Sequence, residues 1–114
     1  MAFSMIERRA IEALLVAYCE KRVPPEVRDK VRVLFRIKGE SVTLLESRPS
    51  FVDRTHWIDT VVAQFRRSQE TGNWVLYCAD RNSKWHLYEY LRPKKTLRPL
   101  LAEVDRDPTG IFWG

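Results

Sequence analysis

The 114-residue sequence has little that would mark a membrane, secreted or disulfide-linked protein. No apolar run approaches the ~18 residues that a membrane-spanning helix requires, and the first residues lack the apolar core of a secretory signal. Only two cysteines occur, Cys19 and Cys78, without a C-x-x-C or Cys/His grouping, so we expect two reduced thiols. These absences favour a cytoplasmic protein that does not contact a membrane.

The sequence also has no motif that specifies an active site. Neither His56 nor His86 lies at a spacing from a serine or cysteine that identifies a nucleophile. The histidines and cysteines occur singly, unlike the paired ligands of structural zinc sites. The sequence therefore predicts no catalytic residue, no metal and no cofactor, and it favours a non-catalytic protein.

The charge balance is basic, with 20 Lys and Arg against 15 Asp and Glu, a net charge of +5. The excess lies between residues 61 and 98, where basic side chains clearly outnumber acidic ones. Basic side chains attract phosphate whatever the nucleotide sequence, so an anionic partner such as nucleic acid is one hypothesis. An ordinary solvated surface is the competing interpretation.

A helical pattern begins near the amino terminus. Ser4 and Glu7 have the spacing of a capping box, and Val23-Pro24-Pro25 should end the helix. Apolar residues recur between these limits at helical spacing. The expected apolar stripe consists of Ile6, Ala10, Ala13, Leu14, Ala17 and Tyr18.

Five strand-like stretches follow, separated by turns that contain Gly, Asn or Asp. We expect strands at residues 31–38, 42–48, 61–67, 74–79 and 85–90, with an ordered loop at residues 50–60. The connections are those of hairpins, so neighbouring strands should pair antiparallel. In the first strand Val31, Val33, Phe35 and Ile37 should share one face.

A shorter helical stripe of Leu97, Leu100, Leu101 and Val104 precedes Asp107-Pro108 and the ending Ile-Phe-Trp-Gly. The predicted fold class is α+β: an N-terminal helix, a five-stranded antiparallel β meander, a short C-terminal helix and a docked aromatic tail. We expect residues 1–114 to form a single domain. Because large apolar side chains are costly to leave in water, the tail should pack on its own sheet or insert into a neighbouring subunit.

The second face of the predicted sheet is not wholly polar. Its apolar residues, which alternate with polar neighbours, are Leu34, Leu45, Val62 and Val75. Either the C-terminal helix or a second copy of the chain could cover this face. Self-association through these residues and Trp113, in a possible homodimer, is therefore one structural hypothesis.

Basic and aromatic residues of the strands suggest a binding surface. Arg and Lys can follow phosphates while aromatic rings stack on bases. The candidate nucleic-acid-binding residues are Arg36, Lys38, Arg48, Arg66, Tyr77, Lys84, His86 and Tyr88. The competing interpretation is that the aromatic residues fill the core of a small sheet.

One further pattern is that of a hydrolase. Glu46-Ser47-Arg48, with Gln64 and Arg66 on the next strand, is similar to an acidic-x-basic element of metal-dependent nucleases. Such an enzyme normally needs a second carboxylate for its divalent cation, and none is evident. An ion pair between Glu46 and Arg66 or Arg48 is the competing interpretation.

Several strings together resemble a known family. They are Glu20–Asp29 with its proline pair, Ala63–Arg66, Trp74–Tyr77, Asp80–His86 and the ending Glu103–Gly114. Across nearly the whole chain the sequence resembles a small bacterial family of uncharacterised proteins, domain of unknown function 3024. The resemblance implies a bacterial origin and no activity, ligand or catalytic residue. The chain departs from the family pattern at Cys78-Ala79 and Ser83, which argues against a special role for Cys78.

Overall fold

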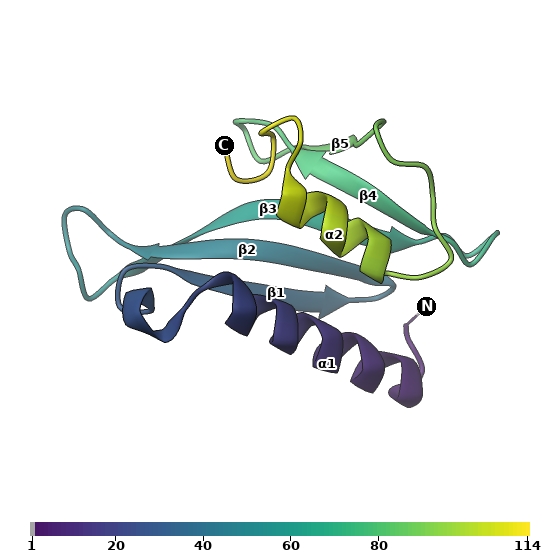
Figure 1. Ribbon diagram of the computed structural model, residues 1–114, viewed down its shortest axis with the longest axis horizontal. Coiled ribbons are helices and arrows are strands. Elements are labelled where there is room, and N and C mark those ends of the chain that lie inside the picture. The colour runs from purple at the N-terminus through teal and green to yellow at the C-terminus, as the bar shows by residue number, and fades with distance from the viewer. Residues whose placement is uncertain (1) are drawn as a thin grey trace.

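Five antiparallel strands and two α-helices make up the fold (Figure 1), in a computed structural model that describes residues 2–114. The strands follow one another in the sheet in chain order, so the predicted meander and the α+β class are confirmed. The elements are α1 (Met5–Arg22), the 3-10 turn η1 (Pro25–Val27), β1 (Arg32–Lys38), β2 (Ser41–Pro49), β3 (Trp57–Arg67), β4 (Trp74–Ala79), β5 (Trp85–Leu87) and α2 (Arg98–Arg106).

The limits of α1 agree with the capping prediction. The Ser4 hydroxyl accepts a hydrogen bond from the Glu7 backbone N–H at 3.2 Å, and the Glu7 carboxylate accepts one from the Ser4 N–H at 2.9 Å. The helix ends at Arg22, before the proline pair. No helix in residues 2–114 is long and apolar enough to cross a membrane.

The predicted apolar stripe of α1 is wrong for most of its members. Ile11 and Leu15 are the buried residues, whereas Ile6 is 84% exposed. Ala10, Ala13 and Ala17 are also exposed, and only Leu14 and Tyr18 of the predicted stripe pack against the core. The helix lies beside β1 at one side of the sheet, and the side chains that reach the core are centred on Ile11 and Leu15.

The strand limits differ from prediction by more than one residue at two places. β3 begins at Trp57 instead of Val61, because Trp57 pairs with Pro49 and lengthens the β2–β3 hairpin. The predicted loop therefore shortens, and a backbone hydrogen bond from Ser50 to His56 closes it. β5 ends at Leu87, although the Tyr88 N–H still donates to the Leu76 carbonyl at 2.9 Å.

A β-bulge in β3 changes which face Val62 occupies. Leu44 pairs with Ala63 but Leu45 pairs with Val61, which leaves Val62 without a partner in the ladder. Val62 is buried and belongs to the core cluster, so its predicted place on the second face is wrong. A bulge of one residue reverses the alternation of side chains, and simple period-two counting cannot anticipate it.

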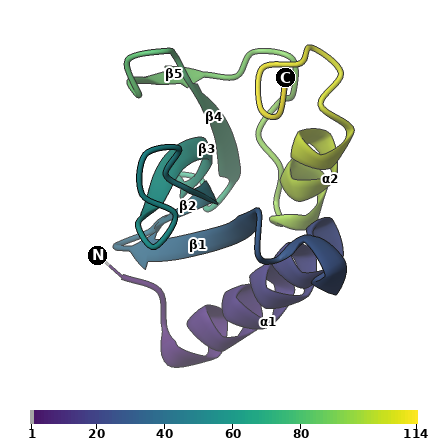
Figure 2. The ribbon, with the colours of Figure 1, turned by 90° about the vertical axis from the view of Figure 1, so that its left-hand side faces the viewer.

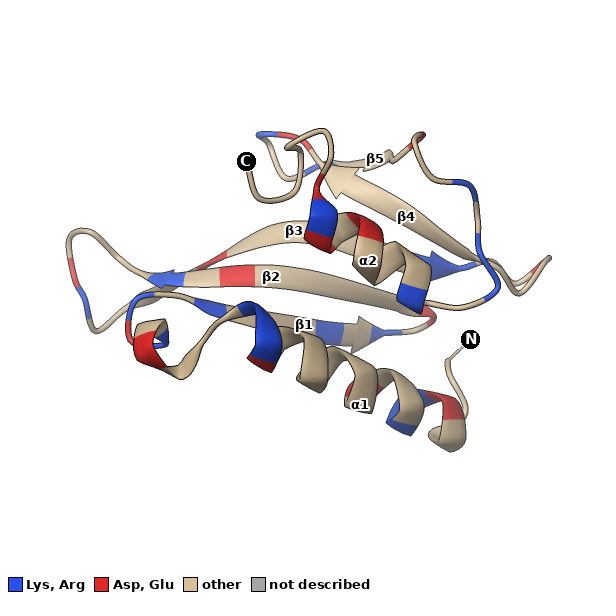
Figure 3. Cartoon of the chain, in the orientation of Figure 1, with Lys and Arg blue, Asp and Glu red and all other residues tan. Residues whose placement is uncertain are grey.

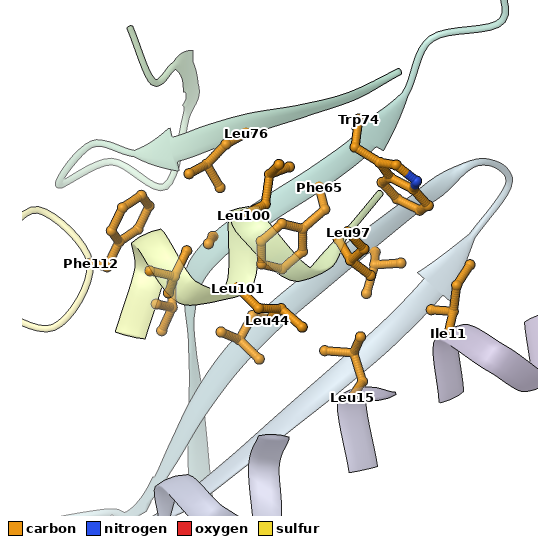
Figure 4. Close-up of a cluster of buried hydrophobic side chains, with 14 of the residues drawn as sticks. Ile11, Leu15, Leu44, Phe65, Trp74, Leu76, Leu97, Leu100, Leu101 and Phe112 are labelled. Carbon is orange, nitrogen blue, oxygen red and sulfur yellow. The ribbon is translucent and has the colours of Figure 1, made fainter. Parts of the chain in front are cut away.

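Both helices cover the same face of the sheet (Figure 2). Phe65, Leu44 and Leu76 from the sheet pack in one cluster with Leu97, which precedes α2, and with residues of both helices, among them Ile11, Leu15, Leu100 and Leu101 (Figure 4). The hypothesis that α2 covers the second face is therefore wrong. α1 lies along β1, so the part of the sheet nearer β4 is left for α2 to cover.

The aromatic tail is docked on its own chain. Phe112 is buried, with its ring centroid 5.1 Å from that of Tyr88. Asp107, in the left-handed region at φ 45°, accepts hydrogen bonds from the backbone N–H groups of Phe112 and Trp113. The Trp113 indole N–H donates to the Val104 carbonyl at 3.0 Å, which secures the tail against α2.

Arg67 joins three segments at one end of the core. Its guanidinium binds the Glu7 carboxylate of α1, and it binds Glu40 of the β1–β2 turn at 2.5 and 2.9 Å. The hydrogen bond from Arg67, together with the backbone N–H of Ser4, lowers the pKa of Glu7 from the ordinary 4.5 to about 2. The same arginine lowers the pKa of Glu40.

We expect the Glu7→Gln variant to reveal this ion pair through its pH dependence. A carboxylate with a depressed pKa stabilises the folded state above its unfolded pKa and loses this effect as pH falls through its folded pKa. The variant should therefore be less stable than the parent at pH 7, and the two should converge between pH 4.5 and about 2. Urea unfolding across that range measures the difference. Glutamine preserves the capping spacing, so a pH-independent difference would contradict the assignment.

Two phenylalanines test the position of the core. Phe65 is fully buried and Phe51 is 95% exposed at the tip of the β2–β3 hairpin. Phe65→Ala should lower the free energy of unfolding by about 3 to 5 kcal/mol, because it leaves a cavity under both helices. Phe51→Ala should change it by less than about 0.5 kcal/mol. Chemical denaturation measures both, and equal losses would contradict the described packing.

Candidate functional site

The sheet face turned away from both helices carries a row of side chains that crosses all five strands. Arg36 pairs with Thr43, Thr43 with Gln64, Gln64 with Tyr77, and Tyr77 with Leu87. Directly paired residues place their side chains on the same face, so these five side chains share one surface. A neighbouring row on this face, which we call the open face, contains Lys38, Ser41, Arg66 and Val75.

Hydrogen bonds and one cation–π contact link the middle of the open face. The Gln64 side-chain amide donates to the Thr43 hydroxyl at 2.9 Å, and Arg66 Nε donates to the Gln64 carbonyl oxygen at 2.6 Å. The Arg66 guanidinium lies 3.8 Å from the centroid of the Tyr77 ring. Arg66 is thus held in one orientation, stacked on an aromatic ring.

Arg36 and Lys38 extend this surface along β1. Arg36 forms an ion pair with Asp59 at 2.9 Å, and both side chains are accessible to solvent. An exposed ion pair is weak, so Arg36 can exchange this carboxylate for another anion at little cost. Lys38 is exposed, and no ion pair involving it occurs in residues 2–114. The two residues supply positive charge at one side of the Arg66–Tyr77 stack.

Arg48 and His86, two more candidate residues, lie on the other face. Arg48 binds Glu46 at 3.0 and 3.4 Å, and Glu46 pairs with the buried Val33. His86 pairs with the core residue Cys78 and contacts the Asp80 carboxylate at 2.7 Å. This contact lowers the pKa of Asp80. Arg48 and His86 therefore do not join the cluster around Arg66.

Tyr88 is part of the core and not of the exposed surface. Its side chain is buried, and its hydroxyl donates to the Glu103 carboxylate at 2.7 Å, which ties the sheet to α2. Burial raises the pKa of Tyr88 to about 12, whereas the hydrogen bond from Tyr88 lowers the pKa of Glu103. Tyr88 is thus removed from the set of surface candidates. Lys84 is exposed in the β4–β5 turn, at the far edge of the sheet.

The residues of the nuclease hypothesis are not brought together. Gln64 is on the open face, whereas Glu46 pairs with Val33 on the helix-covered face and binds Arg48. Within residues 2–114 no group of three or more His, Cys, Asp or Glu side chains is placed to hold a metal ion. Glu46 therefore forms an ion pair with Arg48, as in the interpretation that competes with the nuclease hypothesis.

The sequence prediction missed residues that complete the open face. Arg32 lies on this face, with its guanidinium 4.0 Å from the centroid of the Trp57 ring. The half-exposed Leu87 extends the face at β5. The aromatic and β-branched residues Trp57, Ile58 and Thr60 were the available signal that β3 begins before Val61.

The model of a protein family described as a domain of unknown function, DUF3024, matches residues 3–114. The chain therefore belongs to this family, as the resemblance of the sequence indicated. No curated protein and no solved structure shows significant similarity to the chain.

Proposed function

We propose that this chain is a non-catalytic module that binds single-stranded nucleic acid on the open face. The observation that carries the proposal is the fixed Arg66–Tyr77 stack, which lies in the middle of a sheet face that neither helix covers. A planar guanidinium held in this way presents a flat surface on which a base can stack.

Charge supports an anionic ligand. The open face carries the basic side chains Arg32, Arg36, Lys38 and Arg66, and its nearby carboxylate is that of Asp59. Lysine and arginine beside a stacking platform are the usual combination in proteins that bind single strands, because the cations follow the phosphates while the bases stack. Lys84 would extend the contact at the edge formed by β4 and β5.

The form of the surface favours a single strand over a duplex. A duplex is usually read by a helix or a two-stranded ribbon that enters a groove. The open face instead spreads its polar and aromatic groups across five strands, from Arg36 on β1 to Trp85 on β5. Unstacked bases can lie across such a sheet and contact side chains from several strands.

Self-association through the open face is the second candidate. Leu34 is 42% exposed, which offers some apolar surface. The centre of the face is occupied by Gln64 and Arg66, however, and charged residues are depleted at the centres of protein interfaces. Leu45, which was expected to contribute, is already buried. These features favour the nucleic-acid proposal.

We expect Arg36→Gln/Lys38→Gln to weaken binding of a fluorescein-labelled, mixed-sequence single-stranded oligonucleotide. Loss of two phosphate contacts should reduce the slope of log affinity against log salt by about 1.4, at ~0.7 per contact for single strands. Fluorescence anisotropy between about 50 and 200 mM salt measures both affinity and slope.

The matched control for this experiment is Arg8→Gln/Arg9→Gln, which removes the same charge from exposed positions on α1. This control variant should bind the oligonucleotide within about twofold of the affinity of the parent protein, because contacts that position phosphates act locally. The proposal fails if the parent protein shows no binding at low salt, or if both double variants lose affinity equally.

Arg66→Lys separates charge from stacking. Lysine keeps the positive charge but cannot present a planar surface over Tyr77 or donate in the same way to Gln64. The variant should lose roughly 1 to 3 kcal/mol of binding free energy, the range for one stacked base, with an unchanged salt slope. The same fluorescence anisotropy titration measures the affinity and the salt slope of this variant. Full retention of affinity by Arg66→Lys would show that Arg66 contributes only charge.

A further inference from the structure

A groove runs between α1 and α2, on the face of the molecule opposite the open face. It consists of two adjoining cavities of about 630 and 590 Å³, which share Leu14 and Arg98 as lining residues. From α1 the lining extends from Glu7 to Arg22, and at ~1.5 Å per residue this is roughly 22 Å, or four turns of helix. The groove is therefore elongated.

The floor of the groove is apolar. Leu14 and Ala17 of α1 face Leu101 and Ala102 of α2, with Ala10 and Trp74 toward the other end. Small side chains of both helices, Ala17 and Ala102, line the space between them. Beyond the groove, the exposed Ala13 and Ile6 continue an apolar surface on α1, which was the stripe that the sequence predicted to be buried.

The rim of the groove has an excess of positive charge. Its acidic residues Glu7 and Asp105 are occupied, the first by Arg67 and the second by Arg22 and Tyr18. No ion pair with Lys21, Lys95 or Arg98 occurs in residues 2–114, and all three are exposed. Figure 3 shows basic segments at the carboxyl end of α1, at the start of α2 and in the segment before it.

We infer that the groove binds an amphipathic helix of a partner protein, with an apolar stripe flanked by acidic residues. An apolar stripe would cover Leu14 and Leu101, while carboxylates would pair with the cations of the rim. The length and openness of the groove fit several turns of helix better than a compact small molecule. This inference does not rest on the proposed binding of nucleic acid, which uses the opposite face.

Two synthetic peptides test the inference on the complete chain. Both carry the same leucine stripe at helical spacing, flanked by glutamate in one and by lysine in the other. In an amide-shift NMR titration, the glutamate peptide should shift resonances of Ala10, Leu14, Ala17 and Leu101. The lysine peptide should bind at least tenfold more weakly, because it repels the basic rim.

Two variants locate the site. Ala17→Trp fills the groove from an exposed position and should abolish binding of the glutamate peptide while the spectrum of the folded protein is otherwise retained. Lys21→Glu/Arg98→Glu should weaken the binding of the glutamate peptide at least tenfold. The control Lys30→Glu/Arg81→Glu makes the same charge change at exposed positions outside the groove lining and should have little effect.

Three results would overturn the inference. The first is the absence of shifts along the groove with the glutamate peptide. The second is equal affinity for the two peptides, which would remove the role of the basic rim. The third is a dimer in sedimentation that Ala17→Trp dissociates, because a second copy of this chain would then occupy the groove.

Discussion

The burial of Phe65, Leu44 and Leu76 beneath both helices is the contact on which the rest of the structure depends. A sheet has two faces, and α1 and α2 both pack on the same one. α1 reaches the core mainly through Ile11 and Leu15, while α2 contributes Leu100, Leu101 and Val104. Because both helices pack against the same core, neither of them covers the other face of the sheet.

This arrangement gives the molecule two different surfaces. On the open face, Gln64 and Tyr77 hold the Arg66 guanidinium in place, so a charged group is oriented before any ligand arrives. On the helix side, contacts of Arg22 and Tyr18 with Asp105 join α1 to α2 near one end. An anionic ligand on one face and an acidic helix on the other would make the chain an adaptor between them.

The candidate site was predictable in part. Arg36, Lys38, Arg66 and Tyr77 alternate with apolar residues along strands, and such alternation places them together on one face. Tyr88 follows a similar pattern, yet the chain leaves the sheet after Leu87 and directs its hydroxyl to Glu103. The partner of a buried hydroxyl lies fifteen residues away on α2, and local periodicity contains no information about it.

By itself the sequence determined the elements and their order, because caps, prolines, turn residues and periodicity act over a few neighbouring residues. The Ser4–Glu7 capping box, the end of α1 before its proline pair and the five-stranded meander follow from such local signals. Only the tertiary structure decided which side of α1 is buried, where Val62 lies and which face α2 covers. These outcomes depend on packing between distant segments, where several arrangements satisfy the same apolar pattern and the filling of one shared core selects among them.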